Sequence, residues 1–282
     1  MNRAFSGMIE KALKRYLPAE SLYPREIHEA MRYAVLNGGK RFRPVLVLSA
    51  CEAVGGDPRK ALLPACAVEL IHCYSLVHDD LPALDNDEMR RGMPTCHRKF
   101  GEALAVLTGD ALLTRAFELL GGVQPPAKAL TLLRELADAA GTKGMIGGQV
   151  VDIQFSSNGS RPALDFSALD YINRHKTGRL IRVSAVMGAI VGTRSTSKLK
   201  HMQRYGEALG LAFQVVDDIM DGDGYLRLMN FNEAQQKAEE LISKAEREAL
   251  TFGARGKQLI ELANFLLTRI PTQNDAQVGI KN

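Results

Sequence analysis

The sequence contains no tryptophan, and only 6% of its 282 residues are aromatic. It has no uninterrupted run of the roughly 18 apolar residues that a membrane-spanning helix needs. Residues 1–18 carry Glu10, Lys11, Lys14 and Arg15 and lack the continuous apolar core of a signal peptide. No run of alternating polar and apolar residues predicts β-strands. These absences favour a helical protein with no membrane span, and we expect it to be cytoplasmic.

The cysteines show neither CxxC spacing nor the spacing of a zinc site. They are Cys51, Cys66, Cys73 and Cys96, and we interpret them as small core residues in a reducing compartment. The formal net charge is +4, and lysines and arginines form no long run. Nucleic-acid binding is therefore not expected, and we interpret the basic residues as local ligands of phosphate groups.

Apolar side chains recur with the period of an α-helix along most of the chain, and hydrophobic residues make up 46% of it. We expect helices over residues 3–16, 25–37, 41–55, 58–81, 99–120, 127–141, 143–156, 165–191, 196–221, 231–252 and 255–269. No linker or internal repeat divides the chain, and its length suffices for one large core. The sequence therefore predicts a single all-α domain over residues 1–282.

The chain is organised around a stretch in which an apolar helix leads directly into a cluster of acids. Asp79, Asp80, Asp85 and Asp87 lie within nine residues. Burying carboxylates this close together is costly unless a cation or strong hydrogen bonds compensate. Their hard oxygen atoms suit Mg²⁺, and Mn²⁺ is also possible. Taken alone, the motif has a plain alternative, a solvated acidic loop.

Basic residues gather at two positions. Arg90 and Arg91 follow the acidic cluster, and Lys40, Arg41 and Arg43 follow a pair of glycines. Guanidinium groups bind phosphate oxygens well. Cations at a helix start are unfavourable unless an anion lies nearby. The sequence therefore indicates diphosphate binding, with a basic surface turn as the alternative for the second group.

A second acidic cluster follows another apolar helix. Asp217 and Asp221 are four residues apart and so share a helix face, with Asp218 beside them and Gln214 one turn earlier. Two such clusters favour a site for more than one metal ion.

Five motifs in this order resemble those of the trans-isoprenyl diphosphate synthases, the farnesyl and geranylgeranyl diphosphate synthase family. They are GGKRFRP (38–44), DDLPALDNDEMRRG (79–92), GGQVVD (147–152), HKTG (175–178) and GLAFQVVDDIMD (210–221). The resemblance covers nearly the whole chain and is closest to the bacterial farnesyl diphosphate synthases. It implies an isoprenoid-synthase-type helical bundle around a central cavity. It also implies a homodimer.

The resemblance implies two groups of substrate-binding residues. The first would bind isopentenyl diphosphate and comprises Lys40, Arg43, His72 and Arg91. The second would face the allylic diphosphate and comprises Arg90, Gln149, Asp152, Lys176, Thr177 and Gln214. From the residues alone, His72 is as well explained as a core histidine, and Lys176 as a solvated lysine beside a packing glycine.

Catalysis would follow from metal-assisted ionisation of the allylic diphosphate. Asp79, Asp85, Asp217 and Asp221 are the expected metal ligands. Asp80, Asp218 and Lys176 complete the expected catalytic set. The developing negative charge on the leaving group would be neutralised by these metals and cations. Isopentenyl diphosphate would then attack the allylic cation, and a proton would be lost.

Local features refine this hypothesis. Pro82 predicts that the helix distorts or ends near Leu81, which would bring Asp85 back toward Asp79. Tyr74 lies five residues before Asp79, about 7 to 8 Å back along the helix. A ring there would obstruct a long allylic chain, so we expect a C15 product, with C20 as the alternative. Tyr74 as plain core packing remains a second interpretation.

Two glycine-containing motifs predict irregular helices. Gly147 and Gly148 within a helical run favour close helix packing or a bend. Lys176, Thr177 and Gly178 lie inside a long helical pattern and indicate a kink.

The connection after the second acidic cluster departs from the family pattern. The family has a longer loop, rich in glycine and lysine, where Asp221 here runs almost directly into the helix that includes Glu233–Leu250. We favour omission of a mobile segment over a true deletion. The departure keeps open a catalytically idle regulatory subunit of such an enzyme. A terpene cyclase fits less well, because a cyclase needs no second group of phosphate-binding cations.

Overall fold

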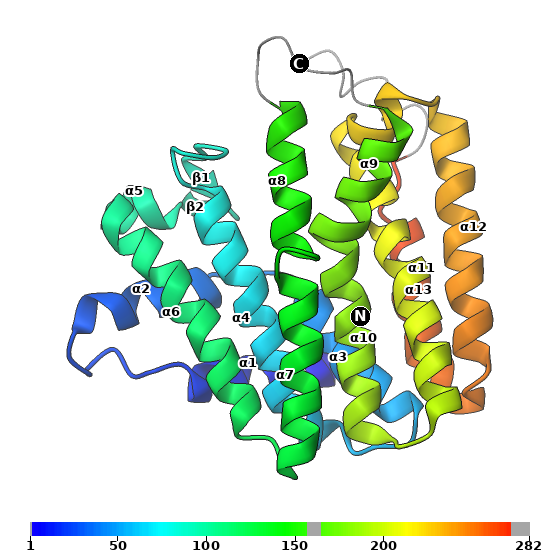
Figure 1. Cartoon of the computed structure of the whole chain (residues 1–282), viewed down its shortest axis with the longest axis horizontal. Coiled ribbons are helices and arrows are strands. Elements are labelled where there is room, and N and C mark those ends of the chain that lie inside the picture. The colour runs from blue at the N-terminus through cyan, green and yellow to red at the C-terminus, as the bar shows by residue number, and fades with distance from the viewer. Residues whose placement is uncertain (1, 157–164, 272–282) are drawn as a thin grey trace. The chain divides into compact units, whose positions relative to one another are not determined.

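The computed structural model describes residues 2–156 and 165–271 (Figure 1). The α-helices are α1 (Arg3–Tyr16), α2 (Arg25–Leu36), α3 (Phe42–Ala53), α4 (Leu62–Asp79), α5 (Cys96–Phe100), α6 (Glu102–Gly121), α7 (Pro126–Ala140), α8 (Met145–Ser156), α9 (Phe166–Ile172), α10 (Arg179–Gly192), α11 (Thr196–Asp221), α12 (Phe231–Leu250) and α13 (Lys257–Leu267). Shorter helical segments are η1 (Pro58–Ala61), η2 (Asn173–Gly178), η3 (Gly224–Arg227) and η4 (Gly253–Gly256). Each helix expected from the sequence has a counterpart, and the all-α prediction is confirmed.

The described strands are β1 (Met89–Arg90) and β2 (Met93–Pro94), which form a short antiparallel hairpin. The sequence analysis missed this hairpin, because strands of two residues leave no alternating pattern. It also treated residues 165–191 as one helix. The structure divides this stretch into α9, the π-helical η2 and α10.

Several helix ends are closed by side-chain caps or by glycine. The Ser195 side chain accepts a hydrogen bond from the Lys198 amide at the start of α11 (3.4 Å). Gly222 ends the same helix in the left-handed conformation (φ +70°), which glycine adopts at little cost. Asn230 and Glu233 form a reciprocal capping box at the start of α12.

The chain divides into two compact units. The N-terminal unit comprises Asn2–Leu48 and Arg59–Arg134. The C-terminal unit comprises Ser49–Pro58 and the described residues from Glu135 onward. A single domain over the whole chain stays a prediction.

In the N-terminal unit, α4 packs along α6, and α1 and α2 contact α4. The interior contains fully buried leucines and isoleucines such as Leu70, Ile71 and Leu112. Arg41 is also buried, at 3% exposure, and lies in the left-handed region (φ +48°). Its guanidinium donates to Glu10 Oε1 (2.7 Å), Glu69 Oε1 (2.8 Å) and the Val35 carbonyl (2.7 Å). Arg41 therefore ties α1, α2 and α4 together and has a structural role.

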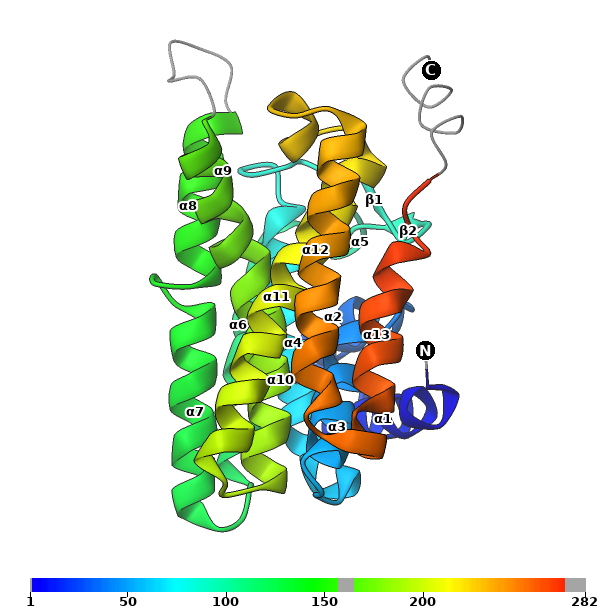
Figure 2. The same cartoon turned by 90° about the vertical axis from the view of Figure 1, so that its right-hand side faces the viewer.

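In the C-terminal unit, α10, α11, α12 and α13 pack in chain order (Figure 2). The buried Tyr205 hydroxyl on α11 donates to the Leu259 carbonyl on α13 (2.8 Å). Glycines permit the closest approach of α11 to its neighbours. A methyl group added at Gly210 would lie 2.9 Å from the Gly178 carbonyl oxygen. This contact brings α11 against η2, which contributes to the candidate site.

All cysteines are free and buried: Cys51, Cys66, Cys73 and Cys96. Burial raises the pKa of Cys66 and of Cys73 to about 12 and that of Cys96 to about 11. This agrees with their interpretation as core residues.

Among the described residues, the segment Pro58–Asp79 is long and apolar enough to cross a membrane by length and composition. The sequence analysis had considered only uninterrupted apolar runs and had passed over it. In the structure, 67% of its apolar window is buried, as in the core helix of a globular unit.

Candidate functional site

The first aspartate cluster begins where α4 ends. The helix stops at Asp79, three residues before Pro82, which cannot donate a backbone hydrogen bond. The chain then turns back on itself, and the Asp85 amide donates to the Asp79 carbonyl (2.9 Å). The prediction that a break near Pro82 returns Asp85 to Asp79 is confirmed for the backbone.

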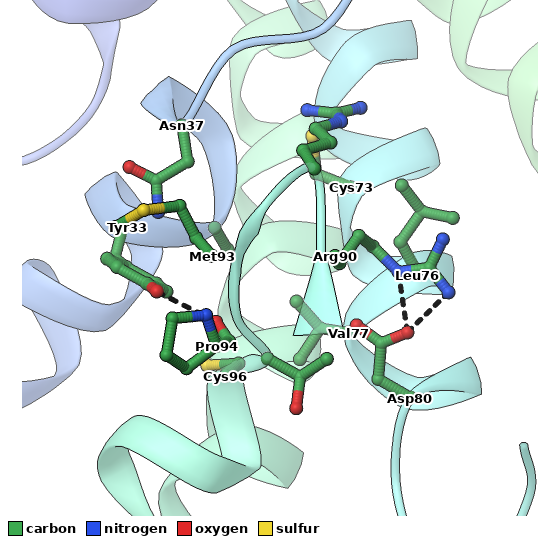
Figure 3. Close-up of a pocket in the computed structure, with 13 residues that line it drawn as sticks. Tyr33, Asn37, Cys73, Leu76, Val77, Asp80, Arg90, Met93, Pro94 and Cys96 are labelled. Carbon is green, nitrogen blue, oxygen red and sulfur yellow. Dashed lines mark hydrogen bonds and ion pairs between the residues drawn. The ribbon is translucent and has the colours of Figure 1, made fainter. Parts of the chain in front are cut away.

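Asp80 is paired with Arg90 from strand β1 (Figure 3). The Asp80 Oδ1 atom lies 2.6 Å from Arg90 Nε and 2.5 Å from Nη2, and Asp80 is only 3% exposed. Burial raises the pKa of Asp80, although Arg90 opposes the shift. Burial, the largest single effect at Arg90, lowers the pKa of the guanidinium, but the hydrogen bond to Asp80 and the charges of the nearby aspartates together outweigh it and raise this pKa. Both pKa values rise, but the rise disfavours the charged form of Asp80 and favours the charged form of Arg90. Burial prevails at Asp80, whereas the combined effect of the aspartates prevails at Arg90. The short distances favour an ion pair.

The cavity beside this pair has a volume of about 40 Å³, which suits a water molecule or two and is too small for a substrate (Figure 3). Tyr33 closes one side of it and donates to the Pro94 carbonyl (2.7 Å). Arg90 also contacts Asp87 Oδ2 (3.1 Å). In this state Arg90 is engaged with two carboxylates, so its expected contact with a diphosphate would require it to exchange partners.

A group of cations surrounds His72 in the N-terminal unit. The pKa of His72 is held well below its usual range. Burial of the ring is the main cause, and the charges of Arg43, Arg91, Arg90 and Arg41 follow. Burial disfavours the protonated imidazole first, and the arginine charges add to this effect. Arg41 and Arg90 are themselves paired with carboxylates. Arg43 and Arg91 are the arginines of this group that belong to the expected anion site.

The glycine pair at 38–39 shapes this cation group. Arg91 Nη1 donates to the Gly38 carbonyl (2.6 Å), and a methyl group added at Gly39 would lie 2.8 Å from the Arg91 guanidinium. Gly39 also has a φ of +112°, which disfavours any other residue. The exposed Lys40 follows directly, and Arg43 is half-buried at the start of α3. The structure thus brings Arg91 to the GGKRFRP motif, as its expected role requires.

Tyr74 is buried in α4, at 5% exposure. Burial, followed by the charge of Asp79, raises the pKa of Tyr74 to about 12. Its ring lies edge-on to His78, with centroids 5.8 Å apart. Its hydroxyl is buried with no hydrogen-bond partner, so the ring acts as an apolar wall in the described unit.

Asp218 and Asp221 of the second aspartate cluster line a cavity of about 610 Å³ in the C-terminal unit, whereas Asp217 does not line it. The polar residues of its wall are Asp152, Asn173, Lys176, Thr177, Gln214, Asp218, Asp221, Asp223 and Arg227. Phe155, Leu169 and Ile172 supply apolar surface. The structure therefore brings together four of the expected allylic-site residues: Asp152, Lys176, Thr177 and Gln214. Gln149 is half-buried on α8 but does not line this cavity.

The kink expected at Lys176 is present as the π-helix η2. Single π-helical turns occur frequently at functional sites. Lys176 Nζ contacts Asp152 Oδ2 on α8 (2.6 Å). A methyl group added at Gly148 would lie 2.2 Å from the Lys176 amide nitrogen, so only glycine allows α8 to approach this close. The packing role expected for the glycine pair is confirmed at Gly148.

Asp218 is buried at 7% exposure and is held from three elements. It accepts hydrogen bonds from Gln214 Nε2 (2.7 Å), Asn173 Nδ2 (3.4 Å) and the Tyr225 amide (3.0 Å). Burial raises the pKa of Asp218 to about 6, while these hydrogen bonds oppose the shift. The carboxylate thus joins α11, η2 and the segment that follows α11. Its expected catalytic role stays a prediction.

Two arginines beside the second cluster were missed from the sequence. Arg269, after α13, contacts Asp217 Oδ1 (2.8 Å) and lies over the Phe213 ring (5.3 Å). Arg227 in η3 makes a two-pronged ion pair with Asp223. Neither arginine belongs to a motif, and the distance of Arg269 along the chain leaves no local signal.

The connection after α11 is short and continuous. The chain passes from Asp221 through Gly222 and η3 to α12 without interruption, and the Asp223 amide donates to the Asp218 carbonyl (3.1 Å). In the structure this short connection is folded onto α11. The omission of a mobile segment from the sequence stays a prediction.

No group of three or more His, Cys, Asp or Glu side chains that could hold a metal ion is assembled among residues 2–156 and 165–271. Asp79 and Asp85 belong to the N-terminal unit, and Asp217 and Asp221 to the C-terminal unit. Their assignment as metal ligands therefore stays a prediction.

The structure has the all-α isoprenoid synthase fold of known prenyltransferases. It matches the crystal structure of an FPP/GFPP synthase from Zymomonas mobilis with a TM-score of 0.88 and 36% identity, covering 94% of this chain and 96% of that one. The polyprenyl synthetase family model matches residues 24–226. The chain belongs to the polyprenyl synthetase family, within the trans-isoprenyl diphosphate synthases, and is a prenyltransferase.

Two curated relatives differ in the product that their names give. The chain is 42% identical to the large subunit 1 of the chloroplastic heterodimeric geranylgeranyl pyrophosphate synthase of Arabidopsis thaliana, covering 93% of this chain and 76% of that protein. It is 46% identical to the farnesyl diphosphate synthase of Geobacillus stearothermophilus, covering 77% of this chain and 72% of that protein.

Proposed function

We propose that the protein condenses isopentenyl diphosphate with dimethylallyl or geranyl diphosphate to form farnesyl diphosphate. The observation that carries this proposal is the cavity of about 610 Å³, which gathers Lys176, Thr177 and Gln214 around Asp218 and Asp221. Cationic and amide donors beside carboxylates fit a diphosphate bound together with metal ions. The cations around His72 supply a separate anion site for the second substrate.

The donor set fits Mg²⁺, with Mn²⁺ as an alternative, because carboxylate oxygens are the ligands that both ions accept. Asp79 and Asp85 would hold metal from the first cluster, since the backbone hydrogen bond between them closes the turn. Asp217 and Asp221 would do so from the second cluster. When bound, the metal would withdraw charge from the diphosphate leaving group.

The chain's own residues supply the rest of the mechanism. Lys176 and Thr177 would bind the allylic diphosphate and neutralise charge as its C–O bond breaks. Lys40, Arg43 and Arg91 would hold isopentenyl diphosphate so that its double bond faces the allylic carbon. Apolar walls exclude the water that would quench the carbocation. The proton lost after condensation passes to the released pyrophosphate, so no side-chain base is needed.

Tyr74 supports a C15 product. Its buried ring lies about one and a half helical turns before the first aspartate of the cluster and would limit the depth available to an allylic chain. Geranylgeranyl diphosphate, C20, is the alternative product, and the relatives include synthases of both kinds. We further propose a cytoplasmic homodimer.

The test is product analysis. Purified full-length protein is incubated with Mg²⁺, labelled isopentenyl diphosphate and either dimethylallyl or geranyl diphosphate, and the products are separated by chain length. A parallel reaction with a chelator controls for the metal. We expect a dominant C15 product that disappears with the chelator. A dominant C20 product would retain the chemistry and contradict the Tyr74 argument. No elongation by folded protein would contradict the enzyme and favour an idle subunit.

A further inference from the structure

The short connection between α11 and α12 contributes two charged residues to the wall of the C-terminal cavity. Asp223 and Arg227 both line it, together with Gly224. The family-model match ends at residue 226, within this connection. Arg227 therefore lies just beyond the matched region. Its function cannot be carried over from a motif.

The connection has a defined conformation rather than an arbitrary one. The buried Asp218 carboxylate accepts from the Tyr225 amide (3.0 Å), and Tyr225 itself is 1% exposed. Gly224 has a φ of +55°, and a methyl group added there would lie 2.2 Å from Asp218 Oδ2. These contacts fix η3 against α11, so the backbone that carries Arg227 is held beside the cavity.

Charge in the cavity wall is unevenly distributed. Its acids are Asp152, Asp218, Asp221 and Asp223, and its cations are Lys176 and Arg227. Lys176 contacts Asp152. Arg227 makes a bidentate ion pair with Asp223, in which Nε meets Oδ1 and Nη2 meets Oδ2. The Asp223–Arg227 pair is exposed, with side chains 53% and 60% accessible. Exposed pairs contribute little stability, so a stronger anion can displace the carboxylate.

We propose that Arg227 is a ligand of the allylic diphosphate and that Asp223 holds its guanidinium in reserve until the diphosphate enters. This inference rests on the proposed function for the identity of the substrate. A guanidinium binds phosphate oxygens through the same fork that it uses for a carboxylate. A diphosphate carries more charge than one carboxylate, and the cavity wall already contains Lys176 and Thr177 to bind it.

Two substitutions separate the roles of the pair. Arg227→Gln removes the cation and should raise the KM for the allylic diphosphate about tenfold, the value of one charge-assisted hydrogen bond. Arg227→Lys should recover part of this loss. Asp223→Asn keeps the side-chain oxygen that caps η3 by accepting from the Gly224 amide (2.7 Å) but removes the competing charge. It should lower the KM about two- to fivefold. The KM for isopentenyl diphosphate should not change in any of these variants.

Arg174 and Asp170 provide matched controls. They form an ion pair with the same four-residue spacing and similar exposure, 54% and 39%, on the same unit. Arg174 does not line the 610 Å³ cavity. Arg174→Gln and Asp170→Asn should therefore leave the KM for the allylic diphosphate unchanged.

A binding measurement separates failure of this inference from failure of the proposed function. Calorimetry with Mg²⁺ and inorganic pyrophosphate needs no turnover, and Arg227→Gln should weaken this binding about tenfold. The inference stands if this weakening is seen, even in a protein that elongates neither primer. It is overturned if Arg227→Gln binds pyrophosphate as the wild type does, if the wild type does not bind it, or if Asp223→Asn binds it more weakly.

Discussion

The Asp85 amide donates a hydrogen bond to the Asp79 carbonyl at 2.9 Å, although the two residues are six positions apart in the chain. This bond closes the turn that follows α4 and sets the backbone positions of two expected metal ligands. If both carboxylates bind metal, Asp85→Asn should lower kcat at least about 100-fold at fixed Mg²⁺. Steady-state kinetics over a range of Mg²⁺ concentrations would measure this.

Asp87→Asn is the control for that substitution. Asp87 lies two residues further on and contacts Arg90 at 3.1 Å, and it is outside the expected ligand set. Its replacement should change kcat by less than about threefold. Equal losses of kcat in both variants would indicate that the total negative charge of the loop matters, and not metal ligation by Asp85.

Arg90→Gln should destabilise the protein because it leaves the Asp80 carboxylate buried without its cation. Arg90 is partly exposed, so we expect a loss of about 2 kcal/mol, below that for a fully buried pair. Thermal unfolding would show a lower Tm. Adding Asp80→Asn should restore part of it, because the uncompensated charge is removed. Arg98→Gln, which breaks an exposed pair with Glu88, is the control and should change Tm little.

Tyr74→Met should lengthen the product. A flexible thioether chain in place of the ring opens depth in the N-terminal unit, so C20 should increase at the expense of C15. Tyr74→Phe keeps the ring and removes only the hydroxyl, which has no hydrogen-bond partner. It should keep the wild-type product distribution. If both variants give wild-type products, Tyr74 does not limit chain length.

Gly148→Ala tests the approach of α8 to the π-helix. The new methyl group would meet the backbone of Lys176 at 2.2 Å, which cannot relax as a side chain would. We expect a loss of about 1 to 3 kcal/mol in the free energy of unfolding, measured by urea titration. Gly7→Ala is the control, since nothing lies within 4 Å of a methyl group at that exposed position in α1. It should stabilise by about 0.5 to 1 kcal/mol.

Glu248 links stability to pH. Hydrogen bonding to Arg204, with a further contribution from His201, lowers the pKa of Glu248 below the ordinary value of 4.5. A lowered acid pKa stabilises the folded state above the unfolded value, and this stabilisation is lost as the pH falls through the folded value. Glu248→Gln should therefore lower Tm at pH 7, and its difference from wild type should shrink below about pH 4. Glu240→Gln, at an exposed site on the same helix, is the control.

Local patterns predicted most of the fold. Periodicity located α1 and α11 to the residue, because this signal arises within the element that it defines. The break at Pro82 was predicted for the same reason. The two-residue strands of the hairpin were not, since they have no periodicity to detect.

Contacts between distant parts of the chain were not predictable in this way. The motif GGKRFRP contains three cations, yet only the structure shows that Arg41 is buried against Glu10 and Glu69. The pairing of Arg269 with Asp217 joins the end of α13 to α11, and no sequence pattern encodes it. Residue type indicated the chemistry at each position, whereas tertiary packing decided which cation serves structure.

The buried thiols give this protein an internal reporter. An alkylating reagent reacts with thiolate, so a thiol with a pKa of about 12 and no solvent access reacts only when its surroundings open. Cys66, Cys73 and Cys96 belong to the N-terminal unit, whereas Cys51 belongs to the other. The labelling rate of each cysteine, followed by mass spectrometry, therefore measures how often its own unit opens. Substrate-dependent protection of one set and not the other would show which unit each diphosphate stabilises.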